Sequence, residues 1–143
     1  TRFMMTLDNA VELVLYALKN GKQGEMFVQK APAAKVSILA KALIELFDSK
    51  SPIQEIGIRH GEKKHETLVT SEEMVKAHDL GNYYSIASDN RNLNYAPDFA
   101  EGSKNGVPSG EYNSDNTERL NVAKMKDLLM QLPEIKNDSL IKL

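Results

Sequence analysis

Residues 85–120 show neither helical nor strand periodicity, and this stretch limits what the 143 residues can fold into. Asn, Asp, Ser, Gly and Pro dominate it, and apolar side chains recur only singly. A structureless connection of that length is uncommon inside a compact domain. We therefore predict an ordered, irregular arm that packs on another surface. The chain then divides into an α/β domain over 1–84 and a region over 85–143 with the arm and a final helix.

Apolar residues spaced three and four apart predict the helical part of the chain. The predicted helices cover residues 6–20, 36–47 and 122–132. Thr70 and Glu73 form a capping-box pattern, which predicts a further short helix ending near His78. The chain is therefore expected to be mostly helical.

Two short apolar runs, 25–29 and 53–58, are the strand candidates, and a predicted helix separates them. A β-α-β unit with a parallel pair of strands is the simplest arrangement for that order. The fold class is therefore α/β, with a short two-strand parallel sheet.

Composition excludes several classes of protein. The absence of cysteine rules out disulfides, thiolate metal sites and thiol nucleophiles. A net charge of −2 is unlike the basic charge of most nucleic-acid or anionic-membrane binders. Without a membrane-length apolar run or a signal-peptide pattern, we expect a cytoplasmic protein. Because Thr1 is not an initiator methionine and a helix follows almost at once, we also expect a piece of a longer chain.

The densest polar cluster follows the second strand candidate, at residues 59–66. Ligand sites of α/β proteins lie beyond the carboxyl ends of strands, and the planar fork of Arg59 suits a phosphate group. Gly61 permits a sharp turn there, and Glu62 is in position to orient Arg59 through a salt bridge. The alternative is a solvated, charged turn, which is the commoner role of a charge run.

Arg2 and Phe3 precede the first predicted helix. An arginine at a helix start opposes the helix dipole, so it is better explained when an anion also binds there. The alternative is a frayed terminus, which is the commoner case.

Other kinds of chemistry find little support in the sequence. His60 and His65 lie five residues apart, off a common helical face, and His78 is the only other histidine, so no metal site is expected. The chain contains no Gly-x-Ser-x-Gly nucleophile elbow and no Gly-rich phosphate loop.

Several stretches taken together resemble one family. They are TRFMMTLDNAVELV at 1–14, GEMFVQKAPA at 24–33, RHGEKKHETL at 59–68, DNRNLNY at 89–95 and EYNSDNTERLN at 111–121. The chain resembles the carboxyl-terminal, substrate-binding part of the UDP-N-acetylglucosamine 4,6-dehydratase/5-epimerase group. This group belongs to the extended short-chain dehydrogenase/reductase superfamily and acts in the synthesis of bacterial capsule, O-antigen or flagellin sugars.

The resemblance implies roles for five residues. Arg2 and Arg59 would bind the diphosphate of a UDP-sugar from two sides. Phe3, Gly61 and Glu62 would support them. The resemblance assigns no catalytic residue to this chain.

The resemblance also implies what the whole enzyme needs. A Rossmann half upstream of Thr1 would bind NAD or NADP and carry the catalytic residues, so this chain would bind no cofactor itself. The chemistry implied is hydride abstraction at C4, loss of water across C5–C6 and hydride return, with inversion at C5 in some members.

Partners follow from the same resemblance. Homo-oligomers are expected, and Tyr95, Phe99 and Tyr112 would anchor the arm on a neighbouring subunit or at the substrate mouth. Packing of the arm within its own chain is the alternative. A freestanding protein-interaction module without catalysis remains the alternative function.

Overall fold

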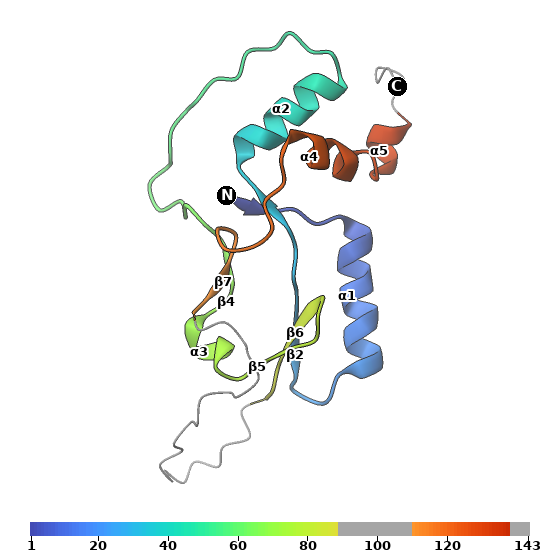
Figure 1. The fold of residues 1–143 in the computed structure, drawn as a ribbon, viewed down its shortest axis with the longest axis vertical. Helices are drawn as coiled ribbons and strands as arrows, with labels where there is room; N and C mark the ends of the chain where they lie inside the picture. Colours follow the sequence, from blue (N-terminus) through green and yellow to red (C-terminus); the bar gives the residue numbers. More distant parts are fainter. Residues whose placement is uncertain (89–109, 138–143) are drawn as a thin grey trace. The chain divides into compact units, whose positions relative to one another are not determined.

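The structure is a computed structural model, and it describes residues 1–88 and 110–137 (Figure 1). Contacts group these residues into two compact units. The first unit contains residues 1–6, 31–66 and 114–137, and the second contains residues 7–30, 67–88 and 110–113. The predicted division at residue 84 stays a prediction. Tyr95 and Phe99 lie outside the described residues.

The first unit is built on two helices that pack together, α2 and α4 (Figure 1). Its elements are β1 (Arg2–Phe3), β3 (Ala33–Ala34), α2 (Val36–Leu46), α4 (Val122–Leu129) and α5 (Pro133–Lys136). The strands β1 and β3 pair antiparallel, with Arg2 opposite Ala34 and Phe3 opposite Ala33. This pairing fixes Arg2 to the strand that leads directly into α2.

The core of the first unit lies between α2 and α4. Ala42 and Met125 are fully buried there, and Ala34 and Leu129 are nearly so. Asn121 caps α4 by accepting a hydrogen bond from the Lys124 N–H at 2.9 Å. The helix predicted over 122–132 ends at Leu129, and a new helix, α5, begins at Pro133, a residue that suits the first turn of a helix.

The second unit combines one long helix with short strands. Its elements are α1 (Leu7–Asn20), β2 (Met26–Gln29), β4 (Thr67–Val69), α3 (Ser71–Met74), β5 (Ala77–Asp79), β6 (Tyr83–Ile86) and β7 (Tyr112–Asn113). The strands form a three-stranded sheet in the order β2-β6-β5 and a separate β4-β7 pair. The predictions for α1, α2 and β2 are thus confirmed to within one residue.

The predicted parallel pair of strands is replaced by antiparallel pairing. Residues 53–58 form no strand, and Ile56 and Ile58 are largely exposed. β2 pairs instead with β6, with Met26 opposite Ile86. β5 and β6 form a hairpin through a short turn at Gly81, where φ is +83°, and closing so short a loop costs little entropy. β6 thus has one partner from its own hairpin, and β2 pairs with its other edge.

The same hairpin shortens the helix predicted to end near His78. The capping box is confirmed: Thr70 accepts from the Glu73 N–H at 3.3 Å, and Glu73 accepts from the Thr70 N–H at 2.9 Å. However, α3 ends at Met74, and His78 lies in β5. The predicted irregular arm is wrong at its ends, since residues 85–86 belong to β6 and 112–113 to β7.

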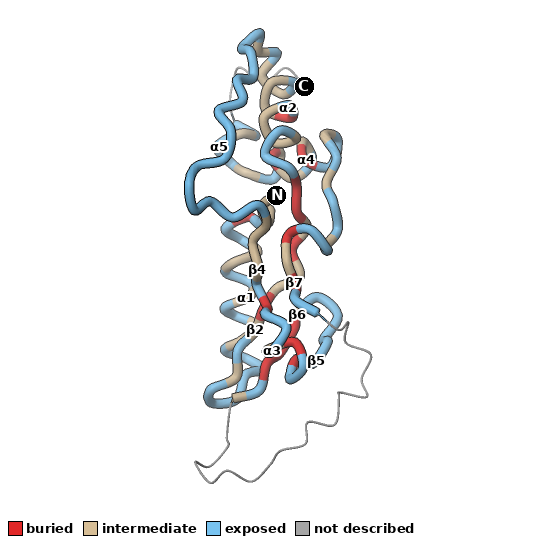
Figure 2. Tube along the Cα trace, turned by 90° about the vertical axis from the view of Figure 1, so that its left-hand side faces the viewer, coloured by how far each residue is buried: buried red, intermediate tan, exposed pale blue. Residues whose placement is uncertain are grey.

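The helix α1 has one packed face and one exposed face. Tyr16 stacks on Tyr83 with ring centroids 4.2 Å apart and meets Phe27 edge-on at 5.6 Å. No residue of α1 is fully buried (Figure 2). An apolar stripe is exposed, formed by Leu7, Val11, Val14, Leu15 and Leu18. Among the described residues, no helix has the length and apolar character needed to cross a membrane.

Candidate functional site

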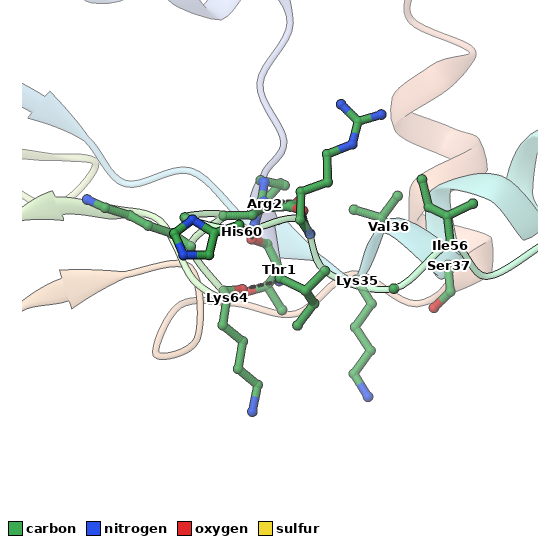
Figure 3. A pocket seen from close by; sticks show the side chains of 14 residues that line it. Thr1, Arg2, Lys35, Val36, Ser37, Ile56, His60 and Lys64 are labelled. Carbon is green, nitrogen blue, oxygen red and sulfur yellow. Dashed lines mark hydrogen bonds and ion pairs between the residues drawn. The ribbon is translucent and has the colours of Figure 1, made fainter.

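A cavity of about 790 Å³ lies in the first unit. Three segments line it: residues 1–2, the start of α2 at 35–37, and the loop at 56–64 (Figure 3). Arg2 and Arg59, the two arginines singled out in the sequence, are therefore on the same cavity.

The loop at Arg59 is held by a closed turn. The Glu62 N–H donates to the Arg59 carbonyl at 3.0 Å, and the Glu62 carboxylate accepts from the Arg59 N–H at 3.1 Å. Gly61 has φ of +80°, a conformation in which a side chain would be strained. The Arg-x-Gly-Glu sequence thus has a structural explanation: Gly61 permits the turn, and Glu62 stabilises it through two hydrogen bonds to the Arg59 backbone.

Glu62 also binds Arg2. The Arg2 Nη2 donates to Glu62 Oε1 at 3.0 Å, Nη1 donates to the Thr1 carbonyl at 2.7 Å, and Nε lies 3.4 Å from Glu66 Oε1. A guanidinium has five N–H groups, so these contacts leave two for a ligand. The sequence interpretation had Glu62 pair with the Arg59 guanidinium; in the structure Glu62 binds the backbone of Arg59 and the side chain of Arg2.

The Arg59 guanidinium is exposed and makes no hydrogen bond or ion pair within the described part of the chain. Cations dominate the cavity wall around it. The ionisable side chains of the wall are Arg2, Lys35, Arg59, His60, Lys63 and Lys64, with Glu62 as the single carboxylate. The site therefore favours anions although the whole chain has a net charge of −2.

A second cavity, of about 410 Å³, shares Thr1, Lys35 and Lys64 with the first. His65, Asp115 and Arg119 complete its lining. The His65 Nδ1 lies 2.8 Å from the Thr1 hydroxyl and 3.6 Å from an Asp115 carboxylate oxygen, and Arg119 pairs with Asp115.

Ser114 connects two segments of this region, at Thr1 and Glu66, through its buried hydroxyl. It is fully buried, and its hydroxyl lies 2.7 Å from the Thr1 hydroxyl and accepts from the Glu66 N–H at 3.0 Å. The sequence analysis gave no site role to Ser114, Asp115, Arg119 or Lys35. The signal was available for the first three, since they lie in the 111–121 stretch that carries the family resemblance.

The remaining predicted residues lie away from the cavity. Phe3 is half-buried in β1 and does not line the cavity. Tyr112 lies in β7 of the second unit, where it is buried and packs edge-on against Tyr84 at 5.4 Å. Among the described residues, no group of three His, Asp or Glu side chains is arranged to hold a metal ion.

The fold and the site together define a class: an α/β protein in which two arginines and several lysines line a cavity suited to an anionic ligand. A family model described as polysaccharide biosynthesis protein matches residues 1–88, and one described as polysaccharide biosynthesis protein C-terminal matches residues 89–136. The chain therefore belongs to the polysaccharide biosynthesis protein family.

Relatives agree with this family but are longer. The chain is 53% identical over 138 residues to a UDP-glucose 4-epimerase of Rickettsia felis and 54% identical to that of Rickettsia akari. These matches cover 96% of this chain and 40% of each relative. The X-ray structure of Pen from Bacillus thuringiensis matches with a TM-score of 0.69 and 30% identity, over 98% of this chain and 38% of that chain.

Proposed function

We propose that this chain is the nucleotide-sugar-binding part of a UDP-sugar-modifying enzyme for bacterial surface polysaccharide synthesis. One observation carries the proposal: Arg2 and Arg59 line one cavity, and the Arg59 guanidinium has no partner within the described residues. The family match and the naming of the Rickettsia relatives as UDP-glucose 4-epimerases support a UDP-sugar as the ligand.

The cavity wall suits a ligand with a charged and an apolar part. Arg59 offers a planar fork of donors that can bind two phosphate oxygens at once, and Arg2 retains two N–H groups for the same task. Ile56 and Ile58 line the same cavity and expose most of their surface. Apolar surface beside the cations favours a nucleotide over inorganic phosphate, because a base or sugar ring can cover it.

The reaction of the whole enzyme has two candidates. The family resemblance favours 4,6-dehydration with possible inversion at C5, and the relatives are named for 4-epimerisation. Product analysis separates them: a dehydratase product is lighter than its substrate by one water, whereas an epimerase product has the same mass. The comparisons offer no support for a freestanding interaction module.

A nicotinamide cofactor belongs to this proposal only through the rest of the enzyme. A dinucleotide site needs a Gly-rich turn between a parallel strand and a helix, and this sequence has no such loop. The named strands of the described residues pair antiparallel. The residues present do not form a nicotinamide site, so NAD or NADP would be bound by a Rossmann part outside them.

We propose a cytoplasmic homo-oligomer for the complete protein.

The test is the affinity of the full-length protein for UDP, measured by calorimetry with Arg59→Ala. Loss of a charge-assisted contact should weaken binding by about 1–3 kcal/mol. Lys41→Ala serves as the control, since Lys41 is exposed on α2 and lines neither cavity. Equal UDP affinity of wild type and Arg59→Ala would contradict the phosphate role.

A further inference from the structure

Lys35 borders both cavities, and it is exposed. It directly precedes α2 in an extended conformation, with φ −70° and ψ 141°. It lines the cavity of Arg59 and also the smaller one. Figure 3 shows its side chain extending in the same direction as that of Lys64. No hydrogen bond or ion pair holds the Lys35 ammonium among the described residues.

A lysine at this position is electrostatically unfavourable for the helix alone. The amino end of a helix carries partial positive charge, and acidic side chains are preferred there. Here the first turn of α2 contains no acidic residue, and no side chain caps it. Val36 and Ser37, the first residues of the helix, line the cavity as well. An anion in the cavity would offset both the lysine charge and the helix end.

The ion pairs around the cavity also favour a ligand-binding role for Lys35. Arg2 is bound to Glu62 at 3.0 Å and lies near Glu66, so two carboxylates partly neutralise it. Arg59 is the other arginine on the cavity, and it has no carboxylate partner within the described part. The diphosphate of a nucleotide sugar carries two negative charges, and Arg59 balances one of them. Of the three lysines that line the cavity, Lys35 alone comes from the amino end of a helix.

We infer that Lys35 is a second phosphate-binding residue, which acts with Arg59 on the diphosphate of the nucleotide sugar. This inference rests on the proposed function and adds a residue that the sequence motifs do not single out. The ammonium supplies charge from the start of α2, a segment that lines the cavity together with the Arg-x-Gly-Glu turn.

The experiment titrates the full-length protein with UDP and, separately, with uridine. Lys35→Met should weaken UDP binding about tenfold, the size of one lost charged contact, and leave uridine binding unchanged because uridine has no phosphate. Lys35→Arg should keep UDP affinity within about twofold, since it retains the charge. Lys41→Met, on the same helix but off both cavities, is the matched control and should bind UDP like wild type.

The outcomes separate this inference from the proposed function. If Arg59→Ala weakens UDP binding and Lys35→Met does not, Lys35 is no phosphate ligand and the proposed function stands. If Lys35→Met weakens uridine and UDP equally, or Lys41→Met matches its loss, the direct contact is overturned. If wild type binds no UDP, the proposed function itself fails. Because Lys35 is exposed, Lys35→Met is expected to fold. Wild-type UDP affinity in Lys35→Arg would show that UDP binding depends on the positive charge at this position.

Discussion

Asp79 shows how one carboxylate links the strands of the second unit. It accepts from the Lys30 ammonium at 2.6 Å and from the Gly81 N–H at 2.8 Å. Lys30 also lies 4.4 Å from the centre of the Tyr84 ring. Both hydrogen bonds favour the charged carboxylate, so the Lys30 contact first and the Gly81 contact second lower the pKa of Asp79.

This lowered pKa makes stability depend on pH. A carboxyl group whose pKa is lower in the folded chain stabilises the fold above its unfolded pKa of about 4, and this contribution is lost as pH falls through the folded pKa. Asp79→Asn should therefore lower the free energy of unfolding at about pH 7, and the difference from wild type should shrink toward about pH 2–3. Urea unfolding at several pH values measures this. Asp127→Asn, at an exposed position of α4, is the control; a wild-type difference that stays constant with pH would contradict the prediction.

At the residue scale, the sequence indicated the two arginines that line the cavity but not their contacts. The roles of Arg2 and Arg59 were predicted from the family resemblance, since their positions beside a helix and a turn left commoner alternatives open. The contact between Arg2 and Glu62 joins residues 60 positions apart, and no local pattern predicts which of two arginines a carboxylate binds. The role proposed for Lys35 was not predicted from the sequence, although Lys35 precedes a predicted helix as Arg2 does.

At the scale of elements, the α2–α4 pair contains the core of the first unit. Met125 is fully buried between these helices, with Ala42 also fully buried beside it. The small alanine on α2 allows close approach, and the flexible methionine fills the remaining space.

Met125→Ala should lower the free energy of unfolding by about 2–5 kcal/mol, because it removes buried apolar atoms and leaves a cavity. Met5→Ala is the matched control: Met5 is 46% exposed, and its change should be within about 0.5 kcal/mol. Chemical denaturation of both variants measures the effect. Equal losses of unfolding free energy from the two substitutions would show that the core of the first unit does not lie between α2 and α4.

Element prediction succeeded where the signal was local and periodic. The helices α1 and α2 and the capping box of α3 are each set by residues within a few positions of one another. The strands were harder, because pairing is decided by distant residues: β2 needed β6, which starts more than fifty positions later. Where the sequence predicted a helix ending near His78, the structure has β5 and a hairpin turn at Gly81.

At the scale of the whole molecule, the apolar stripe on α1 stands out. Leu15 is 60% exposed and Leu18 is 77% exposed, although both are strongly apolar. Contiguous exposed apolar surface of this kind marks an interaction site or a liability to aggregate. Among the described residues, Tyr83 and Phe27 pack on the face of this helix that carries Tyr16.

The 143-residue chain by itself should therefore associate as its concentration rises. Replacing Leu15 and Leu18 together by Gln should reduce that association, since the burial of apolar area drives it. Glu12→Gln, exposed on the same helix, is the control and should associate like wild type. Sedimentation velocity over a range of concentrations measures all three. A wild-type chain that is monomeric throughout, or a double variant that associates equally, would contradict this prediction.

The sequence by itself determined the helices α1 and α2, the capping box of α3, the two candidate arginines and the resemblance to the family, because each depends on residue type at short spacing or on motifs read together. The tertiary structure decided the antiparallel pairing, the shared cavity of Arg2 and Arg59, and the joining of Glu62 to both of them. The physical reason is that strands and charge clusters take their energy from contacts between residues far apart in the chain. Such contacts form only once the chain has closed the loops between them.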